Sequence, residues 1–253
     1  MPERCAFDVM GTVVSIDVRD EIAGDAIAEV RDWLHHVDAV FSPFKPDSEV
    51  SRFARGEIDV VAQNDDLAFV IAACERLFHE TDGYFDAYAR GAFDPSGFVK
   101  GWAIERASAM LVQAGSRHHM INAGGDIRVR GDALPDDGWR IGVVHPADRK
   151  AFSTVVEIRD AAIATSGSSE RGLHVFDPHR GAPAAELASV TIVGPDLTST
   201  DAYATAALAM GRRATDWLAS IRGYESWVVD ARGFVWHSDG FPSLMTAESA
   251  PAR

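Results

Sequence analysis

The hydrophobic pattern changes near residue 118, and this change constrains the fold more than any other feature of the chain. Across residues 65–80, apolar side chains recur at helical spacing, which predicts an amphipathic helix. After residue 118 the apolar segments become short, β-branched and bounded by Gly, Asp or Pro, as strands are. Helices and strands do not alternate strictly. The sequence therefore predicts an α+β fold with mixed antiparallel sheets and packed helices, not a doubly wound sheet.

The same patterns predict the other elements. Residues 5–19 are expected to form a long strand broken at 10–12, and residues 41–48, with two prolines, a loop. Further helices are expected over 21–40, 99–113, 199–210 and 214–221. Further strands are expected at 119–121, 127–129, 139–144, 153–158, 162–165, 174–176, 190–193, 226–229 and 234–237. With no linker or repeat, we expect one domain over 1–242 and a disordered tail over 243–253.

Charge and composition exclude several classes of protein. The net charge is 24 − 38 = −14 and Lys and Arg form no long run, which argues against nucleic-acid binding. The two cysteines cannot build a disulfide framework. We find no apolar run of about 18 residues, so no transmembrane segment is expected. The N-terminus shows no signal peptide, which makes a cytoplasmic location the default expectation.

Two residues four positions apart lie near the start of the Ala-rich helix expected at 199–210. At this spacing the side-chain oxygens of Asp201 and Thr205 share one helix face. A carboxylate and a hydroxyl suit a hard cation such as Mg²⁺, which takes waters and substrate phosphate oxygens as its other ligands. The alternative is purely structural, with Asp201 stabilising the first turn and Thr205 bonded to its own backbone.

The segment from Asp94 to Gly101 opens the helix expected over 99–113. Asp94 or Ser96 can cap this helix, whose free amides and positive dipole end favour an anion. Lys100 adds a positive charge in the first turn. The segment therefore predicts an anion site, and the alternative is an ordinary capped helix with a solvated lysine.

Three further segments are candidates for chemistry. Gly124 and Gly125 join two expected strands, where they permit either close approach to a ligand or a tight hairpin turn. Thr165 and Ser166 lie in a hydroxyl-rich turn. His174 precedes an Asp-Pro turn, where a histidine can act as general acid or base or be structural.

Each segment is common alone, but their order along the chain is specific. The order is Met10-Gly11-Thr12, Phe44 with Asp47-Ser48-Glu49-Val50-Ser51-Arg52, Gly83-Tyr84-Phe85-Asp86, Asp94 with Ser96-Gly97 and Lys100-Gly101, Asn122 with Gly124-Gly125-Asp126, Ala164-Thr165-Ser166-Gly167, His174 with Asp177-Pro178 and Gly181, and Asp201-Ala202 with Ala204-Thr205-Ala206 and Met210-Gly211. From Met10 to Gly211 this order resembles the ApbE family of FAD:protein FMN transferases.

The resemblance implies an α+β fold related to the tunnelling fold, FAD as substrate, and Mg²⁺. Such enzymes transfer FMN to a Ser or Thr hydroxyl of a partner protein through a phosphoester bond and release AMP. For this chain the resemblance implies that Asp201, Thr205 and the carbonyl of Gly97 bind the metal, and that Asp201 and His174 are catalytic, His174 as the base or to orient the pyrophosphate. The implied FAD-binding residues are Met10, Phe44, Tyr84, Phe85, Asp86, Asp94, Lys100, Gly124, Gly125, Asp126, Thr165 and Ser166.

The chain departs from the family pattern in several places. Seven residues separate Asp86 from Asp94, where the family carries a longer insert, and Arg180 and Thr200 stand where Thr and Ala are usual. Two other functions therefore stay open: an FAD pyrophosphatase that forms FMN and AMP, and a non-catalytic FAD-binding protein. The sequence does not name an acceptor protein, and a homodimer is compatible with it on general grounds.

Overall fold

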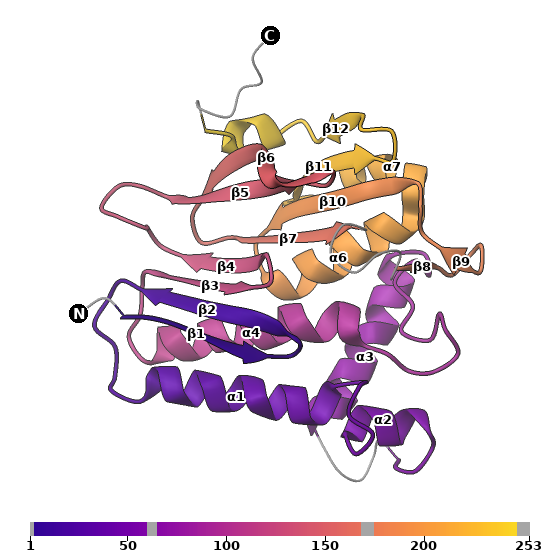
Figure 1. Cartoon of the computed structure of the whole chain (residues 1–253), viewed down its shortest axis with the longest axis horizontal. Coiled ribbons are helices and arrows are strands. Elements are labelled where there is room, and N and C mark those ends of the chain that lie inside the picture. The colour runs from indigo at the N-terminus through magenta and orange to yellow at the C-terminus, as the bar shows by residue number, and fades with distance from the viewer. Residues whose placement is uncertain (1–2, 60–64, 168–174, 247–253) are drawn as a thin grey trace.

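The computed structural model describes residues 3–59, 65–167 and 175–246, and its main feature is an antiparallel sheet of eight strands (Figure 1). In spatial order the strands are β1 (Glu3–Val9), β2 (Thr12–Val18), β3 (His119–Ala123), β4 (Asp126–Arg130), β7 (Ala162–Gly167), β10 (Leu187–Gly194), β11 (Glu225–Asp230) and β12 (Val235–His237). Two separate antiparallel pairs are β5 (Trp139–His145) with β6 (Asp148–Ile158), and β8 (Phe176–Asp177) with β9 (Ala182–Pro183). The expected α+β class is confirmed.

Helices pack against one another and against the sheet. The α-helices of the described residues are α1 (Ala26–Phe41), α2 (Glu49–Ala54), α3 (Asp65–Glu80), α4 (Ser96–Gln113), α6 (Leu197–Met210) and α7 (Ala214–Ser220). The 3₁₀-helices are η2 (Gly211–Arg213) and η3 (Phe241–Leu244). Helix α4 packs against α6, and α6 also packs against β7 and β10 (Figure 1). Among the described residues, no helix is long and apolar enough to cross a membrane.

The sheet has an apolar cluster on each face. On β11, Val228 belongs to the cluster shared with the helices, whereas Trp227 and Val229 belong to a second cluster with β5 and β6. Adjacent strand residues point to opposite faces, so this alternation places the helices on one face and the β5–β6 pair on the other.

Several element boundaries differ from the sequence prediction. The helix expected from residue 21 begins at Ala26, because the carboxylate of Asp20 accepts hydrogen bonds from the backbone amides of Arg117 (2.7 Å) and His118 (2.6 Å) and holds this segment outside the helix. The expected long strand over 5–19 is instead a hairpin of β1 and β2. Its turn uses Met10 and Gly11, whose φ angles of 53° and 68° suit a two-residue hairpin.

Three further differences concern short elements. Helix α2 was not predicted, and it is capped by Ser48, whose Oγ accepts from the amide of Ser51 at 3.1 Å. The strand expected at 174–176 is β8, at Phe176–Asp177, and residue 174 lies outside the described residues. The domain boundary expected after residue 242 falls within η3, and Met245 bridges to Val156 of β6. Residues 247–253 lie outside the described part of the chain.

Candidate functional site

A cavity of about 520 Å³ lies where α4 and α6 meet the β3–β4 turn, β7 and the β5–β6 pair. A volume of this size is typical of small-molecule sites. Most residues that the sequence singled out line it, namely Tyr84, Phe85, Asp86, Asp94, Gly97, Lys100, Gly124, Gly125, Asp126, Thr165, Ser166, Asp201 and Thr205. Segments separated by more than a hundred residues in the sequence are therefore brought into one cavity.

Three predicted site residues are not placed in this cavity. Phe44 is 90% exposed and does not line it. Met10 lies in the β1–β2 turn, packs against the apolar core and does not line the cavity either, although its neighbour Thr12 does. His174 lies outside the described residues.

Where α4 and α6 are in contact, glycines of α4 face polar residues of α6. The backbone N–H of Gly101 donates a hydrogen bond of 3.0 Å to Oδ2 of Asp201. A Cβ at Gly101 would lie 2.5 Å from the carbonyl oxygen of Leu197, and one at Gly97 would lie 3.2 Å from Cγ2 of Thr205. The two helices therefore run in opposite directions, and the glycines of α4 allow Asp201 and Thr205 of α6 to approach closely.

Charged groups surround the buried end of the cavity. The ammonium group of Lys100 pairs with Oδ2 of Asp126 and lies 3.6 Å from Oδ1 of Asp201. Both carboxylates are almost fully buried, and Oδ1 of Asp126 accepts from the backbone N–H of Thr165 at 3.0 Å. Burial raises the pKa of Asp201 to about 7; the charge of Lys100 opposes this shift, and that of Asp126 adds to it.

The residues at this end fit a hard cation. Side-chain oxygens that can ligate a metal lie close together here. Oγ of Ser166 lies 3.3 Å from Oγ1 of Thr205, and both line the cavity with the carboxylates of Asp126 and Asp201. Within the described ranges no group of three or more His, Cys, Asp and Glu side chains could hold a metal unaided. Mg²⁺ characteristically takes one or two carboxylates and completes its shell with waters and substrate phosphates. The donor set therefore suits Mg²⁺ bound together with a phosphate ligand.

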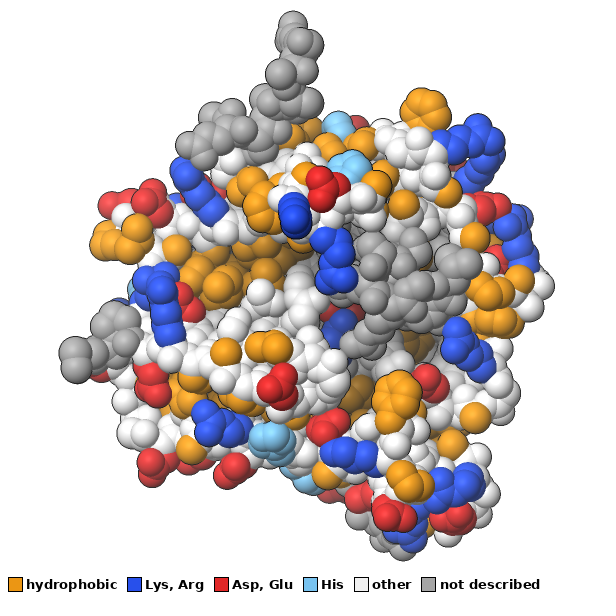
Figure 2. Space-filling view, viewed as in Figure 1, with side chains coloured by type: hydrophobic (Ala, Val, Ile, Leu, Met, Phe, Trp, Pro, Cys, Tyr) orange, Lys and Arg blue, Asp and Glu red, His pale blue; other side chains and the backbone are white. Residues whose placement is uncertain are grey.

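The sequence did not identify several residues that line the cavity. Arg90 precedes α4, and Arg140 and Arg149 come from β5 and β6. Strand alternation predicts that Arg140 lies on the polar face of its strand, but it does not indicate which cavity that face borders. On the face drawn in Figure 2, basic side chains are scattered among acidic ones. The arginines therefore add positive potential to the cavity rather than to a continuous basic surface.

Comparison with known sequences identifies relatives. Two stretches of the chain, residues 10–92 and 89–227, match the model of the ApbE family. A protein of Escherichia coli K12 called FAD:protein FMN transferase is 28% identical over 171 residues, which cover 61% of this chain and 48% of that protein. The chain thus matches about half the length of this relative. A Haemophilus influenzae protein of the same name is 26% identical over 80% of this chain and 79% of its own length.

Solved structures share the fold. The ApbE protein of Thermotoga maritima superposes with a TM-score of 0.87 at 21% identity, over 97% of this chain and 100% of its own. The flavin transferase ApbE of Vibrio cholerae superposes with a TM-score of 0.85 at 22% identity, over 96% and 99% of the two chains. Because the family model spans most of the sequence and the fold agrees throughout, this chain belongs to the ApbE family.

Proposed function

We propose that this chain transfers FMN from FAD to a Ser or Thr hydroxyl of a partner protein, with release of AMP and with a requirement for Mg²⁺. The names of its relatives support flavin transfer as the reaction. The observation that carries the proposal is the buried end of the cavity, where Lys100, Asp126, Asp201 and Thr205 meet. A pyrophosphate is the group that this combination of a cation, carboxylates and hydroxyls suits best.

The bond changes of the reaction are simple. The acceptor hydroxyl oxygen bonds to the FMN phosphorus, the phosphoanhydride bond breaks, AMP leaves, and the hydroxyl proton passes to a base. Asp201, Thr205 and the carbonyl of Gly97 would hold Mg²⁺, which would neutralise negative charge on the phosphates. Lys100 and the N-terminus of α4 add fixed positive potential. His174 is the proposed base, and it lies outside the described residues.

The rest of the cavity provides surfaces for the remainder of FAD. Tyr84, Phe85 and Phe176 contribute aromatic rings to the lining, and Arg140 and Arg149 contribute positive charge. Aromatic rings can stack on the flavin or adenine, whereas guanidinium groups favour phosphate oxygens. FAD has an anionic pyrophosphate between two flat ring systems, the flavin and the adenine, so both aromatic and basic side chains suit it.

Mass spectrometry tests the proposed reaction directly. The protein is incubated with FAD and Mg²⁺, with and without a Thr-containing acceptor peptide, and the peptide mass and AMP are measured. We expect the peptide to gain the mass of FMN and AMP to be released. Release of FMN and AMP without labelling would identify a pyrophosphatase instead, and fully intact FAD would contradict both enzymatic functions.

A matched pair of variants tests the role of the site. Asp201→Asn keeps the side-chain size and an acceptor for Gly101 but removes the negative charge, so transfer should fall by roughly a hundredfold or more. Asp148→Asn makes the same chemical change at an exposed position of β6 and should leave transfer unchanged. Equal activity of the two variants would exclude Asp201 as a metal ligand.

A further inference from the structure

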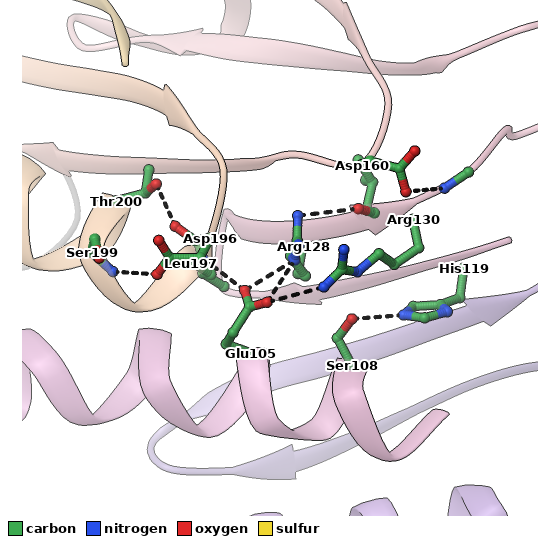
Figure 3. Close-up of polar contacts among 12 residues, drawn as sticks. Glu105, Ser108, His119, Arg128, Arg130, Asp160, Asp196, Leu197, Ser199 and Thr200 are labelled. Carbon is green, nitrogen blue, oxygen red and sulfur yellow. Dashed lines mark hydrogen bonds and ion pairs between the residues drawn. The ribbon is translucent and has the colours of Figure 1, made fainter. Parts of the chain in front are cut away.

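The carboxylate of Glu105, on α4, joins three elements at one point (Figure 3). Its Oε2 accepts a hydrogen bond of 2.7 Å from the backbone N–H of Leu197, the first residue of α6. On β4, Nε of Arg128 lies 3.0 Å from Oε2 and Nη2 of Arg130 lies 3.4 Å from Oε1. One side chain therefore fixes the beginning of α6 relative to both α4 and the sheet.

This contact continues the α4–α6 contacts of the site. Glu105 meets Leu197, Gly101 meets Asp201 and Gly97 meets Thr205, and we call these three contacts the helix ladder. Residues four apart share a helix face, so the three contacts lie in one row on each helix. Glu105 is thus one step from the contact that holds Asp201. It does not line the cavity, since the described lining residues of α4 end at Lys100.

One backbone N–H in the first turn of α6 has this carboxylate as its hydrogen-bond acceptor. The first four N–H groups of a helix have no partner within the helix. Asp196, the N-cap residue, accepts from the N–H of Ser199 at 2.8 Å, and Thr200 Oγ1 donates to the Asp196 carbonyl at 2.6 Å (Figure 3). The N–H of Leu197 is bonded to Glu105, a residue of another helix, so this bond ties the first turn of α6 to α4.

Arg128 holds the carboxylate in place. Its side chain is 2% exposed, and a buried guanidinium requires a counter-charge. Burial lowers the pKa of Arg128, and the charge of Glu105 opposes this shift. The Arg128 guanidinium and the Glu105 carboxylate each serve as the counter-charge of the other. Glu105 therefore has little freedom to leave the Leu197 amide.

We propose that Glu105 is a positioning residue for the cation and phosphate site. By accepting the Leu197 N–H it sets the register of α6 on α4, and so places Asp201 and Thr205 opposite Gly97 and Lys100. The metal in this inference rests on the proposed function, whereas the placement of α6 on α4 concerns only residues of this chain.

Two double variants separate positioning from folding. Glu105→Met with Arg128→Met replaces the buried ion pair by apolar side chains, a change that is often neutral for stability. Glu105→Gln with Arg128→Met removes the same charges but keeps an oxygen that can accept from Leu197. Mn²⁺ affinity is measured by isothermal titration, folding by thermal unfolding, and the Gly101 amide by hydrogen exchange.

We expect the Met/Met protein to bind Mn²⁺ roughly tenfold more weakly than the Gln/Met protein, which should stay near wild type, because one hydrogen bond at α6 is lost. The Gly101 amide should exchange faster in the Met/Met protein. Equal Mn²⁺ affinity and equal exchange in the two proteins would overturn the proposal. If wild type binds no Mn²⁺ in the absence of a phosphate ligand, the Gly101 exchange rates of the two proteins decide the positioning by themselves.

A second pair tests the donor instead of the acceptor, in case the double variants do not fold. Leu197→Pro removes the N–H at the first helical position, where proline is tolerated, and the preceding Asp196 is already extended (φ −143°, ψ 151°). Leu197→Ala loses a similar apolar contact but keeps the N–H. Weaker Mn²⁺ binding and faster Gly101 exchange in the proline variant alone are expected, and identical behaviour of the pair would contradict the proposal.

Discussion

The backbone N–H of Gly101 on α4 is bonded directly to the buried carboxylate of Asp201 on α6, at 3.0 Å. A side chain at position 101 would collide with this arrangement, since a Cβ there would lie 2.5 Å from the Leu197 carbonyl oxygen and 2.8 Å from Cβ of Asp201. The site and the packing of the two helices thus depend on the same residue.

Gly101→Ala should therefore destabilise the protein by about 1–3 kcal/mol, although alanine is the better helix former. Urea unfolding measures this difference. Ala109→Gly, at an exposed position of the same helix, calibrates helix propensity and should cost up to about 1 kcal/mol. A Gly101→Ala protein more stable than wild type would mean that α6 moves away without cost.

Replacement of Lys100 by Gln should weaken FAD binding by roughly tenfold or more, because the charged donor beside Asp126 and Asp201 is lost. Quenching of flavin fluorescence gives the dissociation constant. Lys150→Gln removes an exposed lysine of β6 that does not line the cavity and should leave affinity unchanged. If both variants bind FAD as wild type does, Lys100 is a structural counter-ion alone.

His119 should make stability fall in mild acid. Its ring is bonded to the hydroxyl of Ser108 at 2.8 Å (Figure 3) and to that of Ser116 at 2.9 Å. Burial lowers its pKa from 6.5 to about 4. Between these values the unfolded chain binds a proton that the folded chain does not, so folding stability falls as pH drops from about 6.5 to about 4, by roughly 3 kcal/mol in total.

The pH dependence is measured by urea unfolding at several pH values, for wild type and His119→Gln. The variant is expected to be less stable near neutral pH but to lose less stability on acidification. Parallel pH curves for the two proteins would show that His119 is not the group responsible.

Phe44→Ala should leave FAD affinity within about twofold, because this ring is 90% exposed and lies outside the cavity lining. Phe176→Ala removes a ring that lines the cavity and should weaken binding by about tenfold. Titration of both variants with FAD compares them. A loss of affinity in Phe44→Ala as large as in Phe176→Ala would place Phe44 against the bound flavin.

Strong periodicity made the long elements predictable. The helix expected over 65–80 is α3, because its apolar residues follow the period of one buried face. Local patterns failed where a distant group intervenes, as for residues 21–25, which stay outside α1 while Asp20 bonds to the amides of Arg117 and His118. Helix α2 is too short to show a period, and the capping role of Ser48 was its main signal.

The site was predictable to the extent that its chemistry lies in local segments. Asp201 and Thr205 share a face because of their spacing, and the Asp94–Gly101 segment contains the start of α4, although the helix begins at Ser96 rather than at 99 and its N-cap residue, Pro95, makes no side-chain cap. The link between Glu105 and Leu197, 92 positions apart in the sequence, has no local signal, and the same holds for the arginines of β5 and β6 at the cavity. These features depend on how the helices and strands assemble.

The helix ladder also limits where residues can be inserted into or deleted from this chain. Its contacts recur every four residues on both helices, so neighbouring contacts are about 6 Å apart along each axis. One residue inserted or deleted between Gly97 and Glu105, or between Leu197 and Thr205, would turn the following contacts by about 100° and separate them. A change of length within either of these two helix segments should therefore separate Asp201 and Thr205 from α4, so both segments must keep their length.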